Sequence, residues 1–118
     1  MIAVIFELWP QAQPQPDQAS EYFELAAALT PQLQTMDGFI SIERFESRAT
    51  PGKFLSLSFW RDEAAVQAWR NRPSHRDAQA RGRDGVLRDY RLRVAQVLRD
   101  YGMAQRDQAP ADSRQQYG

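Results

Sequence analysis

The hydrophobic positions of the N-terminal third of the chain predict one β-strand and one helix. Residues 2–9 are apolar and rich in β-branched side chains, and Pro10 ends the run, which is typical of a strand. Residues 22–33 place Tyr and Leu side chains at helical spacing and so predict a helix with one apolar stripe. Pro31 lies inside that stretch, and we expect it to kink the helix or to break it after Leu29.

The remaining pattern predicts a hairpin, a second helical region and a fourth strand. Residues 39–46 and 53–60 are apolar segments separated by a short turn that contains Pro and Gly, which indicates an antiparallel hairpin. An acidic first turn after the hairpin begins a second helical stretch, which Pro73 interrupts and which continues to about Arg81. Residues 90–101 alternate apolar and polar side chains and predict a strand.

The predicted order β-α-β-β-α-β is that of an α+β, ferredoxin-like domain, in which a four-stranded antiparallel sheet carries both helices on one face. Because both faces of the strands carry large apolar side chains, the face without helices needs another cover. We assign to that uncovered face Ile2, Val4, Phe6, Leu8, Leu55, Leu57, Phe59, Leu92 and Val94. A homodimer packed sheet against sheet, a dimeric α/β barrel, is the simplest way to bury such a face.

Composition narrows the functional classes. The 118 residues suffice for one domain, which we place at residues 1–101, followed by a polar tail of disordered composition at residues 102–118. Fifteen basic residues balance fifteen acidic ones, so no net charge favours binding to nucleic acid or to an anionic membrane. The absence of Cys excludes disulfides and cysteine-based metal sites. The first residues lack the basic segment of a signal peptide and Glu7 interrupts their apolar run, so we expect a soluble, cytoplasmic protein.

Several short motifs resemble one known family. They are Asp37-Gly38-Phe39 at the start of the second strand, Ser58-Phe59-Trp60 at the end of the third, and the stretch from Arg61 to Gln79, which contains an acidic pair, Trp69, Pro73-Ser74-His75 and Ala78-Gln79. Over about residues 1–101 the chain resembles the antibiotic biosynthesis monooxygenase domains. The resemblance implies a dimeric α+β barrel with a pocket in each subunit between the sheet and the helices. Family members include oxygenases that act on polycyclic anthrones and quinols with O₂ and without metal or flavin, beside domains with no assigned reaction.

Four residues are expected to line that pocket. Trp60 matches the pocket tryptophan of the oxygenase members and can stack on a flat substrate, the alternative being a core position under the helices. Ser56 and Ser58 point to the same face as Trp60, where they leave room for a ligand and offer it hydroxyl groups, or else pack against bulky helical side chains. Trp69 lies on the apolar face of the second helix and is expected in the core, where it can form one wall of the pocket.

Two residues are candidates for a catalytic base. Glu7 interrupts an apolar strand, and a carboxylate set against tryptophan and the helices would have a raised pKa and accept a proton from a substrate. The alternative for Glu7 is a salt bridge to an arginine such as Arg44 or Arg91. His75 is the only histidine, so any imidazole base must be this residue, the alternative being a hydrogen-bonded role that orients its helix. Trp9 shares the strand face of Glu7 and is included among the expected substrate contacts.

The haem-degrading branch of the same superfamily is disfavoured. Glu7 stands where that branch has Asn, and Gln79 stands about where it has the haem-ligating His, although glutamine is a poor haem ligand. His75 lies roughly one helical turn too early to replace that ligand. With a single His and no Cys, a tightly held metal is not expected either, so we expect no cofactor.

Two functional hypotheses follow from the sequence. In the first, the chain is a cofactor-independent monooxygenase of the antibiotic biosynthesis type that acts with O₂ on an aromatic polyketide-like or quinol substrate. In the second, it is a non-catalytic dimeric barrel that binds a small molecule. An open pocket that contains Glu7, His75 and Trp60 together would favour the first hypothesis. A filled interior with Glu7 paired to an arginine would favour the second.

Overall fold

The computed structural model describes residues 1–10, 18–81 and 87–118, and the elements along the chain follow the predicted order. They are β1 (Ile2–Pro10), α1 (Gln18–Gln34), β2 (Phe39–Glu46), β3 (Phe54–Trp60), α2 (Glu63–Arg70), α3 (Pro73–Arg81), β4 (Leu87–Gln96) and α4 (Ala111–Tyr117). Within these residues no helix combines the length and hydropathy that a membrane span requires.

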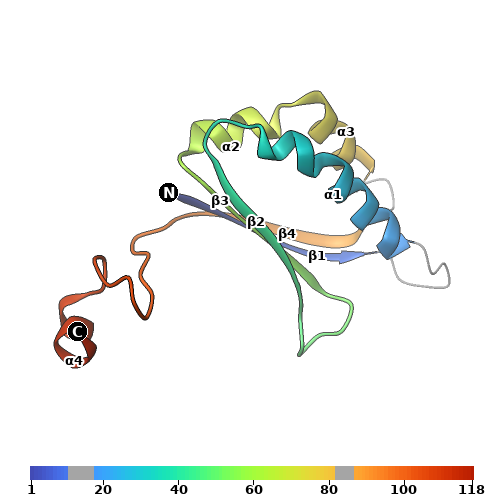
Figure 1. Cartoon of the computed structure of the whole chain (residues 1–118). Coiled ribbons are helices and arrows are strands. Elements are labelled where there is room, and N and C mark those ends of the chain that lie inside the picture. Colours follow the sequence, from blue (N-terminus) through green and yellow to red (C-terminus); the bar gives the residue numbers. More distant parts are fainter. Residues whose placement is uncertain (11–17, 82–86) are drawn as a thin grey trace.

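The four strands form one antiparallel sheet in the order β2-β3-β1-β4. Helices α1, α2 and α3 all lie on the same face of this sheet, so the domain has two layers and one sheet face without helices (Figure 1). This arrangement confirms the predicted α+β, ferredoxin-like fold.

The register of the central strands decides which side chains face the helices. Val4 pairs with Ser58, and Phe6 pairs with Ser56. Because directly paired residues of an antiparallel sheet point to the same face, β1 turns Val4 and Phe6 toward the helices, together with the serines and Trp60. The prediction that Val4 and Phe6 lie on the uncovered face is therefore wrong. Both faces of β1 are apolar, so its alternation alone does not identify the inner one, which the pairing with β3 determines.

The same correction holds for the edge strand β4. Leu92 pairs with Phe6 and Val94 pairs with Val4, so both lie on the helix-facing side and not on the uncovered face to which the sequence assigned them. Ile2 pairs with Trp60 and is therefore also helix-facing, as is Leu8, which shares its face by alternation and is fully buried.

The face without helices, called the outer face below, consists of the other set of alternating positions. Ala3, Ile5 and Glu7 of β1 pair there with Phe59, Leu57 and Leu55 of β3, and Trp9 follows on the same face. The prediction that Leu55, Leu57 and Phe59 point away from the helices is confirmed. The outer face therefore keeps an apolar centre, although its members on β1 differ from the predicted ones.

One compact cluster joins the helices to the sheet. Leu33 of α1, Trp60 of β3, and Ala65 and Trp69 of α2 are all buried, and Trp60 is only 2% exposed. The ring of Phe39 meets that of Trp60 edge to face, with 5.3 Å between centroids. Burial of each large apolar side chain stabilises the fold by about 1.5–3 kcal/mol, so this end of the domain is its main core.

Helix α1 continues through Pro31 to Gln34, so the expected break after Leu29 does not occur. Thr30 Oγ1 donates a hydrogen bond to the carbonyl oxygen of Ala26 at 3.0 Å, on the turn that precedes the proline. The end of the helix is useful to the core, because it carries Leu33 onto Trp60. Tertiary packing here outweighs the local cost of a proline inside a helix.

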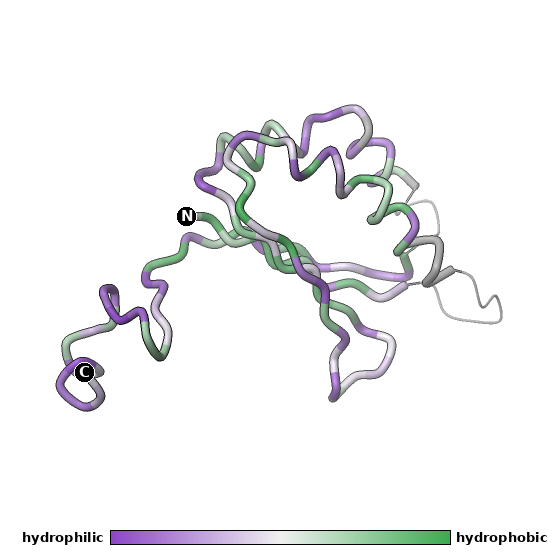
Figure 2. The backbone as a smooth tube through the Cα atoms, viewed as in Figure 1, coloured by the Kyte–Doolittle hydropathy of each residue, from purple (hydrophilic) through white to green (hydrophobic). Residues whose placement is uncertain are grey.

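The end of β4 and the structure of the segment that follows it both differ from the prediction. Strand β4 ends at Gln96, before the predicted Tyr101, and the rest of the chain extends away from the domain and carries α4 (Figure 1). Arg106 holds this segment together, since its guanidinium donates to the carbonyl oxygens of Gly118 at 2.8 Å and Gly102 at 3.2 Å. Figure 2 shows that this extension is mostly hydrophilic. It nevertheless has a defined local structure, which its composition did not indicate.

Replacing two turn glycines by alanine tests how closely the sheet and α2 approach each other. Gly38 and Gly52 both have a positive φ, which costs an L-residue about 1–2 kcal/mol. A Cβ on Gly38 would lie 2.7 Å from Ala65 Cβ, whereas a Cβ on Gly52 would meet nothing within 4 Å. We expect Gly38→Ala to lower the free energy of unfolding in urea clearly more than Gly52→Ala. Equal losses would contradict a tight contact between the turn and α2.

Candidate functional site

A pocket of about 230 Å³ lies between the sheet and the helices. Its floor consists of apolar side chains of the helix-facing strand positions, including Val4, Phe6, Leu92 and Val94. Its roof consists of apolar side chains of α1 and α2, including Leu25, Leu29 and Val66. The interior is therefore hollow beside the Trp60 cluster, and its walls are mainly apolar, as in most small-molecule sites.

The structure brings four of the predicted site residues together. Ser56, Ser58, Trp60 and Trp69 all line the pocket, and all four are also buried. Trp60 Nε1 donates a hydrogen bond to Ser58 Oγ at 3.0 Å, which satisfies the buried indole N–H. The sequence offered two alternatives for the tryptophans, a core position or a pocket wall. Trp60 and Trp69 combine both, since each packs in the core and also lines the pocket.

His75 of α3 also reaches the pocket, on the helical side. Its ring lies 5.0 Å from that of Trp69, and its Nδ1 is buried without a hydrogen-bond partner. Burial lowers the pKa of His75 below its ordinary value of 6.5; the backbone of Arg70 opposes this shift, and the charge of Arg76 adds to it. The imidazole is therefore neutral at pH 7 and able to accept a proton.

The lowered pKa also links His75 to stability. Between the folded and the unfolded pKa the unfolded chain binds the proton and the folded chain does not, so stability rises with pH in that window. The stabilising contribution is complete above pH 6.5 and is lost as the pH falls through the lower, folded pKa.

Glu7 and Trp9 do not belong to this pocket, so the prediction that they face Trp60 and the helices is wrong. Both lie on the outer face, because β1 turns its other side chains inward. Glu7 Oε2 forms ion pairs with Arg93 at 3.3 Å and Lys53 at 3.7 Å, and Lys53 Nζ lies 5.0 Å from the centre of the Trp9 ring. Glu7 therefore forms salt bridges, as the alternative prediction expected, but its partners are Arg93 and Lys53 and not Arg44 or Arg91.

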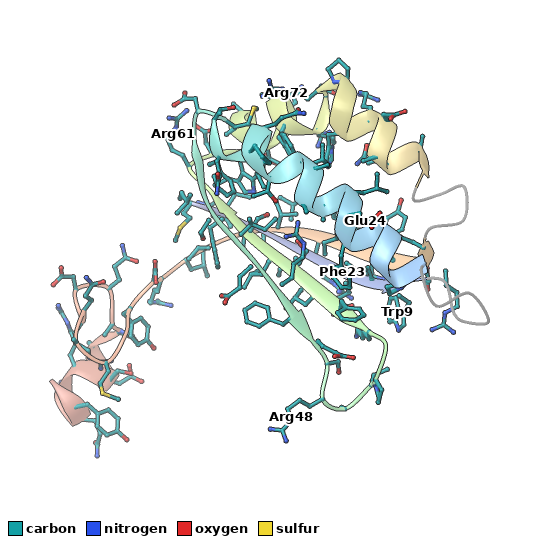
Figure 3. All side chains as sticks on the ribbon, turned by 45° about the vertical axis from the view of Figure 1, so that its right-hand side comes forward. Trp9, Phe23, Glu24, Arg48, Arg61 and Arg72 are labelled. Atoms are coloured by element: carbon teal, nitrogen blue, oxygen red, sulfur yellow. The ribbon has the colours of Figure 1, made fainter. Side chains whose placement is uncertain are left out.

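Figure 3 shows the spatial separation of the two ends of the domain. Trp9 lies at the end of β1, near Phe23 of α1, and far from Arg61 and Arg72 at the opposite end (Figure 3). At that opposite end Arg61 forms two hydrogen bonds with Asp37, of 3.1 and 3.0 Å, and the guanidinium lowers the pKa of the Asp37 carboxyl. These exposed charges join the turn before β2 to the end of β3 and take no part in the pocket.

Arg44 is a pocket residue that the sequence pattern alone did not identify. It was considered only as a partner for Glu7, but it lines the pocket, and its Nε is buried without a hydrogen-bond partner. The hairpin register places Arg44 opposite Ser56, and Ile42 opposite Ser58. Since the serines were expected to face the helices, the hairpin pairing would have placed Arg44 there too.

The charged side chains among the described residues of the pocket lining are of one sign. These residues include Arg44 and Arg70 but no Asp or Glu. No group of three or more His, Cys, Asp or Glu side chains that could hold a metal ion occurs in the described part of the chain. The arrangement offers a proton acceptor, two aromatic walls and a cation to a bound molecule.

Comparison with known proteins gives a consistent picture. The family model described as antibiotic biosynthesis monooxygenase matches residues 1–81. Jasmonate monooxygenase ABM of Pyricularia oryzae is 52% identical over 97 residues, which cover 82% of this chain and 43% of that protein. The chain thus spans less than half the length of this curated relative.

Solved structures support the fold. A crystal structure described as an antibiotic biosynthesis monooxygenase from Deinococcus radiodurans has a TM-score of 0.73 at 17% identity, covering 86% of this chain and 97% of that one. SnoaB of Streptomyces nogalater, described as a cofactor-independent oxygenase, has a TM-score of 0.69 at 12% identity, covering 84% of this chain and 94% of the other. At such identities the likeness concerns the fold alone.

Two serine variants test the hydrogen bond that orients Trp60. Ser58→Ala removes the acceptor of the buried indole N–H, and we expect it to lower the free energy of unfolding by about 1–3 kcal/mol. Ser56→Ala is the matched control, since Ser56 is equally buried on the same strand but is not the acceptor for Trp60. Urea unfolding followed by tryptophan fluorescence measures both. A loss for Ser56→Ala as large as that for Ser58→Ala would argue against this hydrogen bond as the cause.

Proposed function

Because the chain belongs to the antibiotic biosynthesis monooxygenase family, we propose that it is a cofactor-independent monooxygenase for one small, largely apolar molecule held in the pocket. The observation that carries the proposal is the buried, unpartnered Nδ1 of His75 in an apolar cavity beside Trp69. A neutral imidazole in that position can serve as a base, while tryptophan rings hold the body of the substrate.

The proposed reaction balances without an external reductant. The substrate carries a CH₂ group that an adjacent or conjugated carbonyl makes acidic, and His75 removes one proton to leave a carbanion. The carbanion forms a C–O bond with O₂, and the proton returns to give a hydroperoxide. Loss of water with the second hydrogen of that carbon gives a ketone, so one oxygen atom enters the product and the other leaves as water. A quinol fits the same balance, because it too loses two hydrogens and gains one oxygen.

The cavity volume limits the substrate. A cavity of about 150 Å³ holds benzene, so about 230 Å³ accommodates a single ring with substituents. A monocyclic quinol fits this size, and so does the cyclopentanone ring of jasmonate, the compound in the name of the fungal relative. We therefore propose a one-ring substrate that carries a carbonyl or hydroxyl group, which narrows the aromatic polyketide-like class expected from the sequence.

The ion pair of Glu7 is the one observation that agrees with a non-catalytic barrel. Glu7 is paired with Arg93, as that hypothesis expects, but the interior is hollow and lined by His75 and Trp60, as the monooxygenase hypothesis expects. Since Glu7 lies on the outer face, its ion pair says nothing about the chemistry of the pocket. The site itself supports the monooxygenase.

We also propose that the protein is a homodimer through its outer face. Ile5, Leu55, Leu57 and Phe59 form the apolar centre of that face, and Phe45 beside them is 43% exposed. A second copy would cover this centre by a two-fold contact of sheet on sheet.

A single charge at the centre of the outer face tests the dimer. We expect Leu57→Glu to give a monomer in sedimentation velocity, because a carboxylate facing a second copy would be buried without a partner. Arg48→Glu, a charge change in the turn after β2, should leave the assembly unaltered. A wild-type protein that sediments as a monomer at micromolar concentration would remove the proposal.

Oxygen consumption tests the proposed reaction. Purified protein treated with a chelator should consume O₂ with at least one member of a panel of hydroquinones, anthrones and jasmonate-like cyclic ketones. We expect His75→Gln to lower the rate by about 10²- to 10⁴-fold, and the wild-type rate to rise with pH through a pKa below 6.5 and then level off.

The same assay distinguishes the two bases expected from the sequence. Glu7→Gln should keep the wild-type rate, because the carboxylate lies on the other face of the sheet. A rate lost in Glu7→Gln but kept in His75→Gln would overturn the assignment. Binding of panel members without any O₂ consumption would support the non-catalytic barrel.

A further inference from the structure

Some polar groups that line the pocket have hydrogen-bond partners within the protein, and others do not. Ser58 Oγ is already used by Trp60, whereas Arg44 Nε is buried and lacks a hydrogen-bond partner. Among the ion pairs formed by described residues, none includes Arg44. A buried N–H donor without an acceptor costs free energy, so the pocket favours a ligand that supplies an acceptor, and a negatively charged acceptor most of all.

The position of Arg44 makes it a specific anion contact and not a general surface charge. Its strand pairing places it in one row across the floor with Ser56, Phe6 and Leu92, so the guanidinium borders an otherwise apolar surface. Arg70 also lines the pocket, but it is exposed at the last turn of α2, where water and the helix C-terminus stabilise its charge. Of the two arginines among the described lining residues, Arg44 is therefore the one that faces the interior.

The chemistry of arginine identifies the matching group. A guanidinium presents N–H donors in a planar fork that pairs with the two oxygens of a carboxylate. Among the described residues that line the pocket, no Asp or Glu competes for these donors. The mainly apolar walls leave little provision for a second charge, so a substrate with a single negative group fits and a strongly polar one does not.

We propose that Arg44 anchors the carboxylate of the substrate, which is an alicyclic or aromatic monocarboxylate. This inference rests on the proposed function, since it names the substrate class of the same pocket. The carboxylate binds on the sheet side at β2, the ring lies against Phe6 under α1, and His75 acts from the helical side. Arg44 thus fixes which end of the molecule enters first and which carbon meets the base.

Binding of an acid and its neutral ester tests the inference directly. The probes are jasmonate and methyl jasmonate, with cyclohexylacetate and its methyl ester as a second pair, measured by calorimetry and by quenching of tryptophan fluorescence. We expect the wild-type protein to bind at least one acid about 10- to 100-fold more tightly than its ester, as a charge-assisted hydrogen bond predicts.

Variants assign that preference to one residue. Arg44→Gln should weaken binding of the acid by about 10- to 100-fold and leave binding of the ester within a few-fold, so the discrimination disappears. Arg44→Lys keeps the charge but not the fork and should retain part of the preference. Arg48→Gln, the same change of charge in the turn after β2, should bind as the wild type does. Circular dichroism establishes that each variant is folded.

The outcomes separate this inference from the proposed function. Acid binding that depends on Arg44, without O₂ consumption, would support the carboxylate anchor and refute the monooxygenase. O₂ consumption with neutral substrates at rates unchanged in Arg44→Gln would support the monooxygenase and refute the anchor. Equal affinity of the wild-type protein for acid and ester, or no binding of either acid, would also refute the anchor.

Discussion

Contact between Trp60 and helices α1 and α2 sets the distance between the layers of this domain. The indole is almost fully buried against Leu33 of α1 and against Ala65 and Trp69 of α2, so it fixes the helices at one end of the sheet. Further along β3 the helix-facing positions are serines, which are too small to fill the same distance. A large residue beside two small ones on one strand thus produces both the core and the cavity, and the cavity is held open by the same packing that stabilises the fold.

The polar groups in that cavity depart from what packing alone would select. A neutral histidine nitrogen without a partner and a buried arginine nitrogen without an acceptor each cost free energy, and a side chain chosen for stability alone would be apolar. Such local violations are expected where a protein binds or converts a ligand. The charged groups outside the cavity behave differently. Glu7 and Asp37 are both satisfied by basic partners, and they stabilise strands and turns without facing the pocket.

Much of this organisation was predictable from the sequence, and the errors have identifiable causes. The order of elements followed from periodicity and turn residues, and the serine-rich face of β3 followed from its alternation with Leu55 and Leu57. The inner face of β1 was not predictable from β1 alone, because both of its faces are apolar; the error misplaced Glu7 and hid the significance of Arg44. The local structure of residues 102–118 was not predictable from composition, because it depends on specific hydrogen bonds, among them those of Arg106 and Arg114.

The alternation along β3 also has a consequence for how this protein can diverge. Ser56 and Ser58 shape the cavity, whereas the leucines between them belong to the opposite face of the sheet. Mutations at neighbouring positions of β3 therefore affect different properties. A change at a serine alters the cavity volume, whereas a change at a leucine alters the outer face. Within this seven-residue strand the freer position is Ser56, because Ser58 also accepts the hydrogen bond of the buried Trp60 on which the core depends.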